Sequence, residues 1–294
     1  MEFETVSRVL VLGFTIGCTY ALMALGLNLL WGTMRMLNVA HGSLIMLGAY
    51  AAYWLFVLYG VSPLLSGGVA VLGGAALGLI LYRLLFRAKL KTTKSLEKLE
   101  VYSYLIFFGS LIIIDNVASL LWTSRIRGYT YLTQTVPVLG TPVPLNRLFA
   151  SVIAIAVAFG FYFFLRRTMF GKAIRAVIQD NIAAQLMGIN VNRVFAFCFA
   201  AAFATAGLSG TLLSMFYPIQ PFMGLPYTMT AFVVVILGGL GNILGSLIGG
   251  IMLGIVVTAG VSATTPGFGF LIMYIIFILV ILVAPSGILG RRIR

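Results

Sequence analysis

Few side chains in this 294-residue sequence could carry out chemistry, and the only histidine is the first to consider. His41 lies inside an apolar stretch, MLNVAHGSLIMLGAY, residues 36–50. Catalysis or metal binding would need a partner group nearby, and the surrounding sequence offers none. A buried polar side chain must instead be hydrogen-bonded. We therefore expect an architectural role for His41 rather than substrate contact, with Asn38 capping the following helix and Gly42 allowing close approach.

Asp115 is the only carboxylate well inside an apolar segment, and Asn116 follows it. If that segment crosses a membrane, a charged aspartate at its centre costs about 2.5–3.5 kcal/mol, so it should face the bundle interior or an aqueous path. Two interpretations stay open. Asp115 and Asn116 lie on a substrate path, or Asp115 lies near the outer end and pairs with Arg125 or Arg127.

The two cysteines complete the set of reactive side chains. Cys18 and Cys198 both lie in apolar segments and indicate neither a disulfide framework nor a metal site. A single intramembrane aspartate also argues against an aspartyl protease, which needs two carboxylates. We therefore expect no catalytic residue and no metal site, and the chain is not predicted to be an enzyme.

The glycine-rich run VVVILGGLGNILGSLIGGIMLG resembles a nucleotide loop only superficially. It lacks the Lys-Ser/Thr pair of a phosphate-binding loop. Gly241, Gly245 and Gly249 recur at four-residue spacing, which predicts a helix face of small residues where helices approach closely. No ATP site is therefore expected in this chain, and no cofactor.

The composition requires a membrane environment. Hydrophobic residues make up 61% of the chain and charged residues 9%, too little polar surface for a soluble protein of this length. The net charge of +13 resides in short clusters between apolar runs, where topology signals lie, so it does not indicate nucleic-acid binding. Glu2 and Glu4 stand where a cleaved signal would carry basic residues, and the first apolar segment is therefore expected to stay in the mature protein.

Three basic clusters mark the segment ends expected to face the cytoplasm. They are residues 83–98, residues 166–193 and the terminal RRIR, residues 291–294. Clusters on the same side of a membrane must be separated by an even number of crossings. Two apolar segments fit the first interval, four fit the second, and three precede the first cluster. The N-terminus is therefore predicted outside and the C-terminus in the cytoplasm.

The predicted fold is an all-α polytopic transmembrane helix bundle with eight or nine membrane segments, forming a single domain over residues 1–294. Breaks in the last third fall at YPIQPFMGLP, GGLGN and ATTPGFG, where Gly and Pro favour turns. Residues 227–240 and 243–259 are short and glycine-rich, so a re-entrant hairpin is the alternative to two crossings. The segments predicted before them are residues 9–31, 37–59, 63–82, 101–122 and 148–165.

The predicted cytoplasmic loop contains a short capped helix. Asp180 is a good N-cap residue, and Gly188 suits the position after the C-cap. Ile182 and Leu186 recur at helical spacing. Two turns of helix are not stable alone in water, so this helix needs a partner surface. A surface amphipathic helix is the alternative.

This loop also carries a family resemblance. AAQLMG, residues 183–188, resembles the Ala-Ala-x-x-x-Gly core of the coupling motif in permease subunits of ABC importers, although Ile182 stands where those permeases usually have Glu. Residues 12–50 and the glycine-rich run are similar to segments of the branched-chain amino acid permease family. The Asn-x-Ala-His-Gly pattern of that family falls on Asn38, Ala40, His41 and Gly42.

The resemblance implies a permease subunit of a binding-protein-dependent ABC importer. Such a subunit would move branched-chain or other small amino acids across the bacterial inner membrane by alternating access. The implied partners are a second related permease subunit or a second copy, two ATPase subunits that bind ATP and Mg, an extracytoplasmic binding protein and surrounding lipid. The residues implied in ATPase coupling are Asp180, Ala183, Ala184, Leu186 and Gly188.

Two alternatives to this function stay open. Related systems carry other amino acids, amides or urea, so the substrate is not fixed. A secondary transporter or channel without ATPases is less favoured, because coupling-ion sites need intramembrane ionisable groups and only Asp115 is available.

Overall fold

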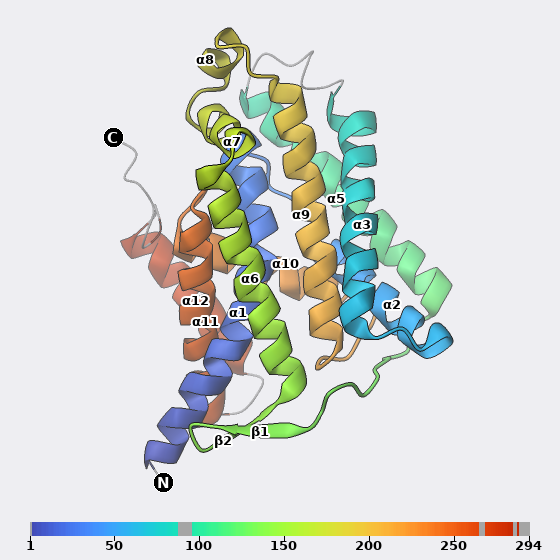
Figure 1. Ribbon diagram of the computed structural model, residues 1–294, viewed down its shortest axis with the longest axis vertical. Coiled ribbons are helices and arrows are strands. Elements are labelled where there is room, and N and C mark those ends of the chain that lie inside the picture. The colour runs from blue at the N-terminus through green and yellow to red at the C-terminus, as the bar shows by residue number, and fades with distance from the viewer. Residues whose placement is uncertain (1, 88–95, 265–267, 285–286, 288–294) are drawn as a thin grey trace.

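The computed structural model describes residues 2–87, 96–264, 268–284 and 287, and within them it shows a helical bundle with one small β-hairpin (Figure 1). The elements in chain order are α1 (Glu2–Met34), α2 (His41–Tyr59), α3 (Pro63–Leu81), the π-helix η1 (Tyr82–Phe86), α5 (Leu96–Trp122), β1 (Thr135–Val138), β2 (Thr141–Pro144), α6 (Leu145–Arg167), α7 (Met169–Gln179), α8 (Asn181–Leu186), α9 (Val191–Ser214), α10 (Gly224–Gly238), α11 (Ile243–Ala263) and α12 (Phe268–Val283).

The apolar helices confirm the all-α polytopic bundle. Within the described ranges, seven helices are long and apolar enough to cross a membrane, and two apolar helices are shorter, α10 and the one near the end of the chain. These nine helices agree with the larger of the predicted eight or nine segments, although only seven of them reach spanning length. Of the pair for which a re-entrant hairpin was the alternative, α11 has 21 residues and reaches spanning length, whereas α10 has 15.

Different elements lie at the two ends of the bundle. The start of α1 and the β1–β2 hairpin lie at one end, and α7 and α8 lie at the other (Figure 1). The basic residues of the 166–193 cluster belong to the α7–α8 end. The predicted cations Lys89, Lys91 and Lys94, the terminal RRIR and part of the ATTPGFG break lie outside the described residues.

The β-hairpin was not predicted. β1 pairs with β2 in antiparallel register, Thr135 opposite Pro144 and Val138 opposite Thr141. The turn between the strands places Leu139 and Gly140 at positive φ, which the tightest hairpin turns require of both central residues. The hairpin lies in the loop between α5 and α6, directly before α6.

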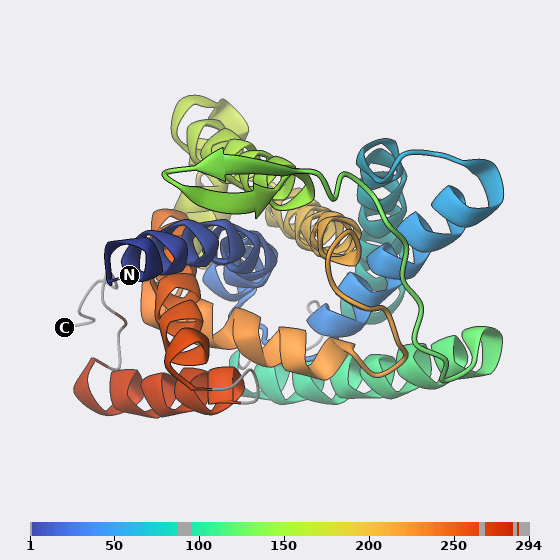
Figure 2. The same cartoon turned by 90° about the horizontal axis from the view of Figure 1, so that it is seen from below.

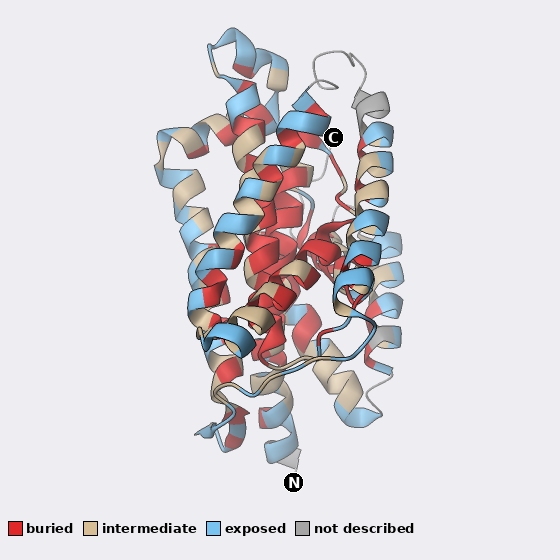
Figure 3. Cartoon of the chain, turned by 90° about the vertical axis from the view of Figure 1, so that its right-hand side faces the viewer, coloured by how far each residue is buried: buried red, intermediate tan, exposed pale blue. Residues whose placement is uncertain are grey.

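Buried residues lie at the centre of the bundle (Figure 3), and they come mostly from α1, α2, α9 and α10. Lipid is as apolar as leucine, so membrane helices associate through close packing of small residues rather than through apolar burial. Gly13 and Gly17 of α1 accordingly lie directly against the backbone around Ile255 and Ile251 of α11. Helices α3, α5, α6 and α12 surround this core and expose large apolar side chains over much of their length.

Helix α2 begins inside the bundle. After α1 ends, residues 35–40 return along it, so that His41 lies beside the carbonyl of Met23. That carbonyl is 11 residues before the end of α1, about 16 Å along a helix with a rise of 1.5 Å per residue. Helix α2 therefore begins four residues later than the predicted segment 37–59, although its 19 residues still reach spanning length. Figure 2 shows α10 lying across the middle of the bundle when it is viewed from below.

Candidate functional site

The short helix α8 has the predicted cap at its N-terminus. Asp180 Oδ1 accepts hydrogen bonds from the backbone amides of Ile182 (2.8 Å) and Ala183 (3.0 Å). These amides have no partner within a helix of this length, so the carboxylate satisfies two of the free donors at its start. The cap fixes where the helix begins.

The C-terminus of α8 has an equally defined geometry. Gly188 has φ of +80°, its amide donates to the Gln185 carbonyl, and the amide of Ile189 donates to the carbonyl of Ala184. This pair of bonds is the Schellman motif, which requires a left-handed residue at the position of Gly188. The predicted helix limits are therefore right to within one residue.

The outer face of α8 is apolar and uncovered. Ile182 is 73% exposed, Leu186 83% and Met187 82%, whereas Ala184 is 3% exposed and faces the rest of the chain. α7 links α8 to the bundle, with its buried side chains directed inward and Lys172 and Arg175 exposed. Exposed apolar groups rimmed by charge are typical of a protein-binding surface. Ala183 and Gly188 lie on this exposed side, and Ala184 does not.

His41 occupies a buried position where α1 and α2 meet. It is fully buried, and its Nε2 donates to the Met23 carbonyl (2.8 Å) because a carbonyl oxygen can only accept. The amide of Gly42 donates to Thr228 Oγ1 (2.8 Å), and a Cβ at Gly42 would overlap the carbonyl of Gly224. α2 and α10 thus meet with their backbones in contact. These contacts fit an architectural role.

Asn38 does not cap α2. The N-cap is Ala40, which makes no side-chain capping bond. The amide of His41 donates to the carbonyl of Asn38 in a tight turn, so the Asn38 side chain is two residues too early to reach the helix start. Its amide group is buried without a hydrogen-bond partner among the described residues.

Asp115 faces the bundle interior. It is 3% exposed, and its Oδ1 accepts a hydrogen bond from Ser43 Oγ (2.7 Å), in the first turn of α2. Arg127 instead donates to the Trp122 carbonyl and lies over the Trp54 ring. The interpretation in which Asp115 pairs with an outer arginine is therefore wrong, and a carboxylate at a helix N-terminus is favourably placed.

Asn116 points away from this contact. Its Nδ2 donates to the carbonyl of Ile112 in its own helix, and the side chain is exposed. Asp115 and Asn116 therefore lie on different sides of α5. Neither residue lines the pocket around Tyr129 and Arg147 or the apolar pocket around Phe232. A substrate path through this pair stays a prediction.

Asn28 is an important residue that was missed from the sequence. This buried side chain on α1 donates to the Asn242 carbonyl (2.8 Å) and to Ser246 Oγ (2.6 Å), and it accepts from the Gly241 amide. One side chain thus holds the whole turn between α10 and α11. The signal was available, because a polar residue inside an apolar helix needs a partner.

Of the three glycines predicted to share a helix face, Gly241 does not belong to the helix. Gly241 belongs to the turn before α11 and has φ of +81°. Gly245 and Gly249 do lie on α11, but they contact α10 at Gly238. The long contact of α11 with α1 instead uses Gly250 and Gly254. The two neighbours α10 and α1 thus meet different faces of α11.

The loop after α5 and the loop after α9 are joined to one another. Arg127 and Ile219 exchange both backbone hydrogen bonds at 2.8 Å. Tyr129 shares a hydrogen bond of 2.7 Å with Ser214, and Asn146 donates to the Met215 carbonyl. The loop between α5 and α6 is therefore fixed onto the end of α9.

Comparisons with known proteins agree with this architecture. The family model described as "Branched-chain amino acid transport system / permease component" matches residues 9–282. The high-affinity branched-chain amino acid transport system permease protein LivH of Escherichia coli K12 is 31% identical, over 95% of this chain and 94% of that protein. A probable LivH of Methanocaldococcus jannaschii is 34% identical over 92% and 88%.

A solved structure shares the fold. PsaBC from Streptococcus pneumoniae, in complex with Fab, superposes with a TM-score of 0.51 at 12% identity and covers 97% of both chains. At this identity the likeness concerns the arrangement of the helices alone.

Proposed function

The chain belongs to the family of permease components of branched-chain amino acid transport systems, as a membrane permease subunit of an ABC importer, and from this we propose what it moves and what it binds. It moves branched-chain or other small amino acids inward across the bacterial inner membrane. Two ATPase subunits bind ATP and Mg, and a second permease chain or a second copy completes the membrane portion. An extracytoplasmic binding protein delivers the substrate. The N-terminus lies outside and the C-terminus in the cytoplasm.

Helix α8 is the observation that carries the proposal. Both of its ends are fixed by hydrogen bonds, while its apolar outer face has no cover within the chain. A rigid apolar projection is suited to a cleft in an ATPase subunit. α7 packs against α6, α9 and α1, so movement of α8 is passed to helices that include the central α9.

The outer loops supply the opposite surface. The joined loops at residues 123–146 and 217–226 lie at the end of the bundle away from α8. We place the docking of the binding protein there. Asp115, beside the first turn of α2, is our candidate for a polar point on the substrate path.

A purified complex tests the role of α8. Burial of each Leu or Ile side chain contributes about 1.5–3 kcal/mol, so replacing Ile182 and Leu186 together by Gln should weaken ATPase binding at least about 100-fold. ATP-dependent uptake of L-leucine into proteoliposomes should fall with it. Met169→Gln is the matched control, because Met169 is 80% exposed at the same end but precedes α8.

Each outcome has a distinct meaning. Retained ATPase binding in the double variant would overturn the coupling role of α8. Uptake of urea but not of L-leucine by the wild-type complex would overturn the substrate assignment and leave the coupling role standing.

A further inference from the structure

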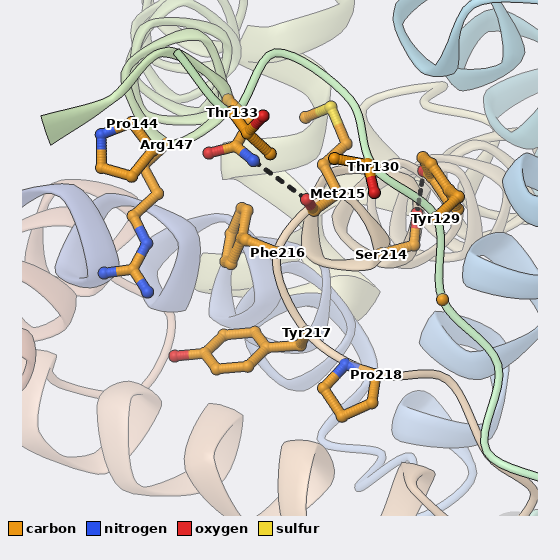
Figure 4. A pocket seen from close by; sticks show the side chains of 12 residues that line it. Tyr129, Thr130, Thr133, Pro144, Arg147, Ser214, Met215, Phe216, Tyr217 and Pro218 are labelled. Atoms are coloured by element: carbon orange, nitrogen blue, oxygen red, sulfur yellow. Dashed lines mark hydrogen bonds between the residues drawn. The ribbon is translucent and has the colours of Figure 1, made fainter. Parts of the chain in front are cut away.

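A pocket of about 430 Å³ opens at the outer end of the bundle (Figure 4). It lies between the loop that precedes the β-hairpin, the start of α6 and the loop from α9 to α10. Its volume is in the range of small-molecule sites. The hydrogen bonds that join the outer loops also hold its walls.

Arg147 brings a positive charge to this pocket. In the described part of the chain no carboxylate forms an ion pair with it, and its guanidinium lies 5.7 Å from the centre of the Phe216 ring. In Figure 4, Arg147 and Tyr217 reach toward the same side of the pocket. Burial raises the pKa of Tyr217, against the opposing effect of Arg147, so its hydroxyl is a proton donor. A guanidinium beside a hydroxyl donor is suited to a carboxylate.

Asn146 brings an unsatisfied acceptor to the same pocket. The side chain is 3% exposed, and its Nδ2 donates to the carbonyls of Tyr131 (3.2 Å) and Met215 (3.0 Å). Both partners are carbonyl oxygens, so the atom that faces them is the amide nitrogen and the other atom is Oδ1. That oxygen is buried without a partner in the described structure. Buried acceptors are almost always paired, so this one calls for a donor.

We propose that this pocket is an entry site for a free α-amino acid, occupied between its release by the binding protein and its passage through the membrane. The carboxylate binds Arg147 and Tyr217, and the ammonium group donates to Asn146 Oδ1. An apolar side chain lies against Phe216. The site rests on the proposed function, because it assumes that the transported solute is an amino acid.

Binding of L-leucine to the whole transporter complex in nanodiscs, without binding protein, tests the site. We expect wild-type complex to bind radiolabelled L-leucine weakly. Loss of one charge-assisted contact weakens binding about 10- to 100-fold, and we expect Arg147→Gln to lower the affinity for L-leucine by this factor. Arg147→Lys should restore part of the affinity, and Tyr217→Phe should lower it less than Arg147→Gln does. Arg125→Gln is the matched control, since Arg125 is exposed in the same loop region but does not line the pocket.

Two competitors locate the contacts. Leucinamide lacks the carboxylate, so it should compete poorly with L-leucine for the wild-type complex. The affinity for leucinamide should be no lower in Arg147→Gln than in the wild type. 4-Methylpentanoate lacks the ammonium group and should also compete poorly. Equal competition by leucinamide and L-leucine would overturn the assignment of Arg147.

Transport separates this site from the proposed function. Two outcomes would overturn the entry site alone. In the first, the wild-type complex imports L-leucine but does not bind it directly. In the second, the Arg147→Gln complex binds L-leucine as well as the Arg125→Gln complex does. The entry site would also be overturned if Arg147→Gln weakened docking of the binding protein and left L-leucine binding unchanged. Arg147 would then contact the binding protein rather than the amino acid. Wild-type complex that imports no L-leucine would overturn the proposed substrate. Assembly of each variant is checked by its retained ATPase subunits.

Discussion

Two regions of this molecule depend on glycine for opposite reasons. Where α2 meets α10, Gly42 leaves room, because a Cβ there would overlap the backbone carbonyl of Gly224. At the end of α8, Gly188 has open space around it but holds a φ of +80° that other residues rarely adopt. The interior contact therefore depends on volume, and the exposed loop depends on conformation.

The polar and apolar groups differ in the same way between these regions. In the interior, Asn28, His41 and Thr228 bond to groups of neighbouring helices in this chain. On α8 the apolar side chains of Ile182 and Leu186 have no cover. These interior groups find their partners within the chain, whereas the outer face of α8 is left for the proposed contact with an ATPase subunit. Variants can test this difference by separating stability from function.

The largest loss of stability is expected from Gly42→Ala. The added methyl group meets backbone rather than a flexible side chain, so α2 and α10 must separate, at a cost of more than about 3 kcal/mol. The measurement is the melting temperature and the monodisperse yield in mild detergent. Gly109→Ala is the control, because a Cβ at Gly109 on α5 has no neighbour within 4 Å. Equal stability of the two variants would mean that the α2–α10 contact is looser than described.

The next largest effect is expected from Asn28→Leu. The change removes the donor to Asn242 and Ser246 and the acceptor for Gly241, and buried backbone groups left without partners cost about 1–3 kcal/mol each. We expect a loss of about 2–4 kcal/mol in reversible unfolding by denaturing detergent. Asn116→Leu should change stability by less than about 0.5 kcal/mol, since Asn116 bonds only within its own helix.

A small effect of Asn28→Leu would be informative too. It would show that Gly238 and Gly245 fix the α10–α11 turn by packing alone.

Sequence reasoning succeeded where structure follows from neighbouring residues. The positions of the apolar segments and the caps of α8 at Asp180 and Gly188 depend on hydropathy, charge and spacing within a few positions. It failed where two distant segments meet. The start of α2 beside Met23, the partners of Asn28 and the glycines that face α1 depend on which helices become neighbours, and one sequence does not contain that information.

Gly188→Val tests the exposed region with a smaller stability effect. A β-branched residue in the left-handed conformation costs about 1–2 kcal/mol, and the helix end should shift. We expect near-normal assembly of the permease in the membrane but at least a tenfold fall in L-leucine imported per ATP hydrolysed, a change of about 1.4 kcal/mol in coupling.

Gly140→Val is the matched control for this prediction. Gly140 also has open space and a φ of +79°, but it lies in the outer hairpin. Its stability loss should equal that of Gly188→Val while ATP coupling stays normal. Normal coupling in both variants would remove α8 from the mechanism.

The smallest effect is expected from Gly73→Ala, which sharpens the comparison within a single helix. Gly73 and Gly74 are neighbours on α3, but only a Cβ at Gly74 would press on the α9 backbone, at the carbonyl of Phe203. Gly73 is exposed with nothing within 4 Å, so alanine there should raise helix stability by up to about 1 kcal/mol. Gly74→Ala should lower it, as Gly42→Ala does. The melting temperatures of the two variants in detergent test this prediction. A loss of stability from Gly73→Ala that appears only in the assembled complex would show that another subunit covers this face of α3.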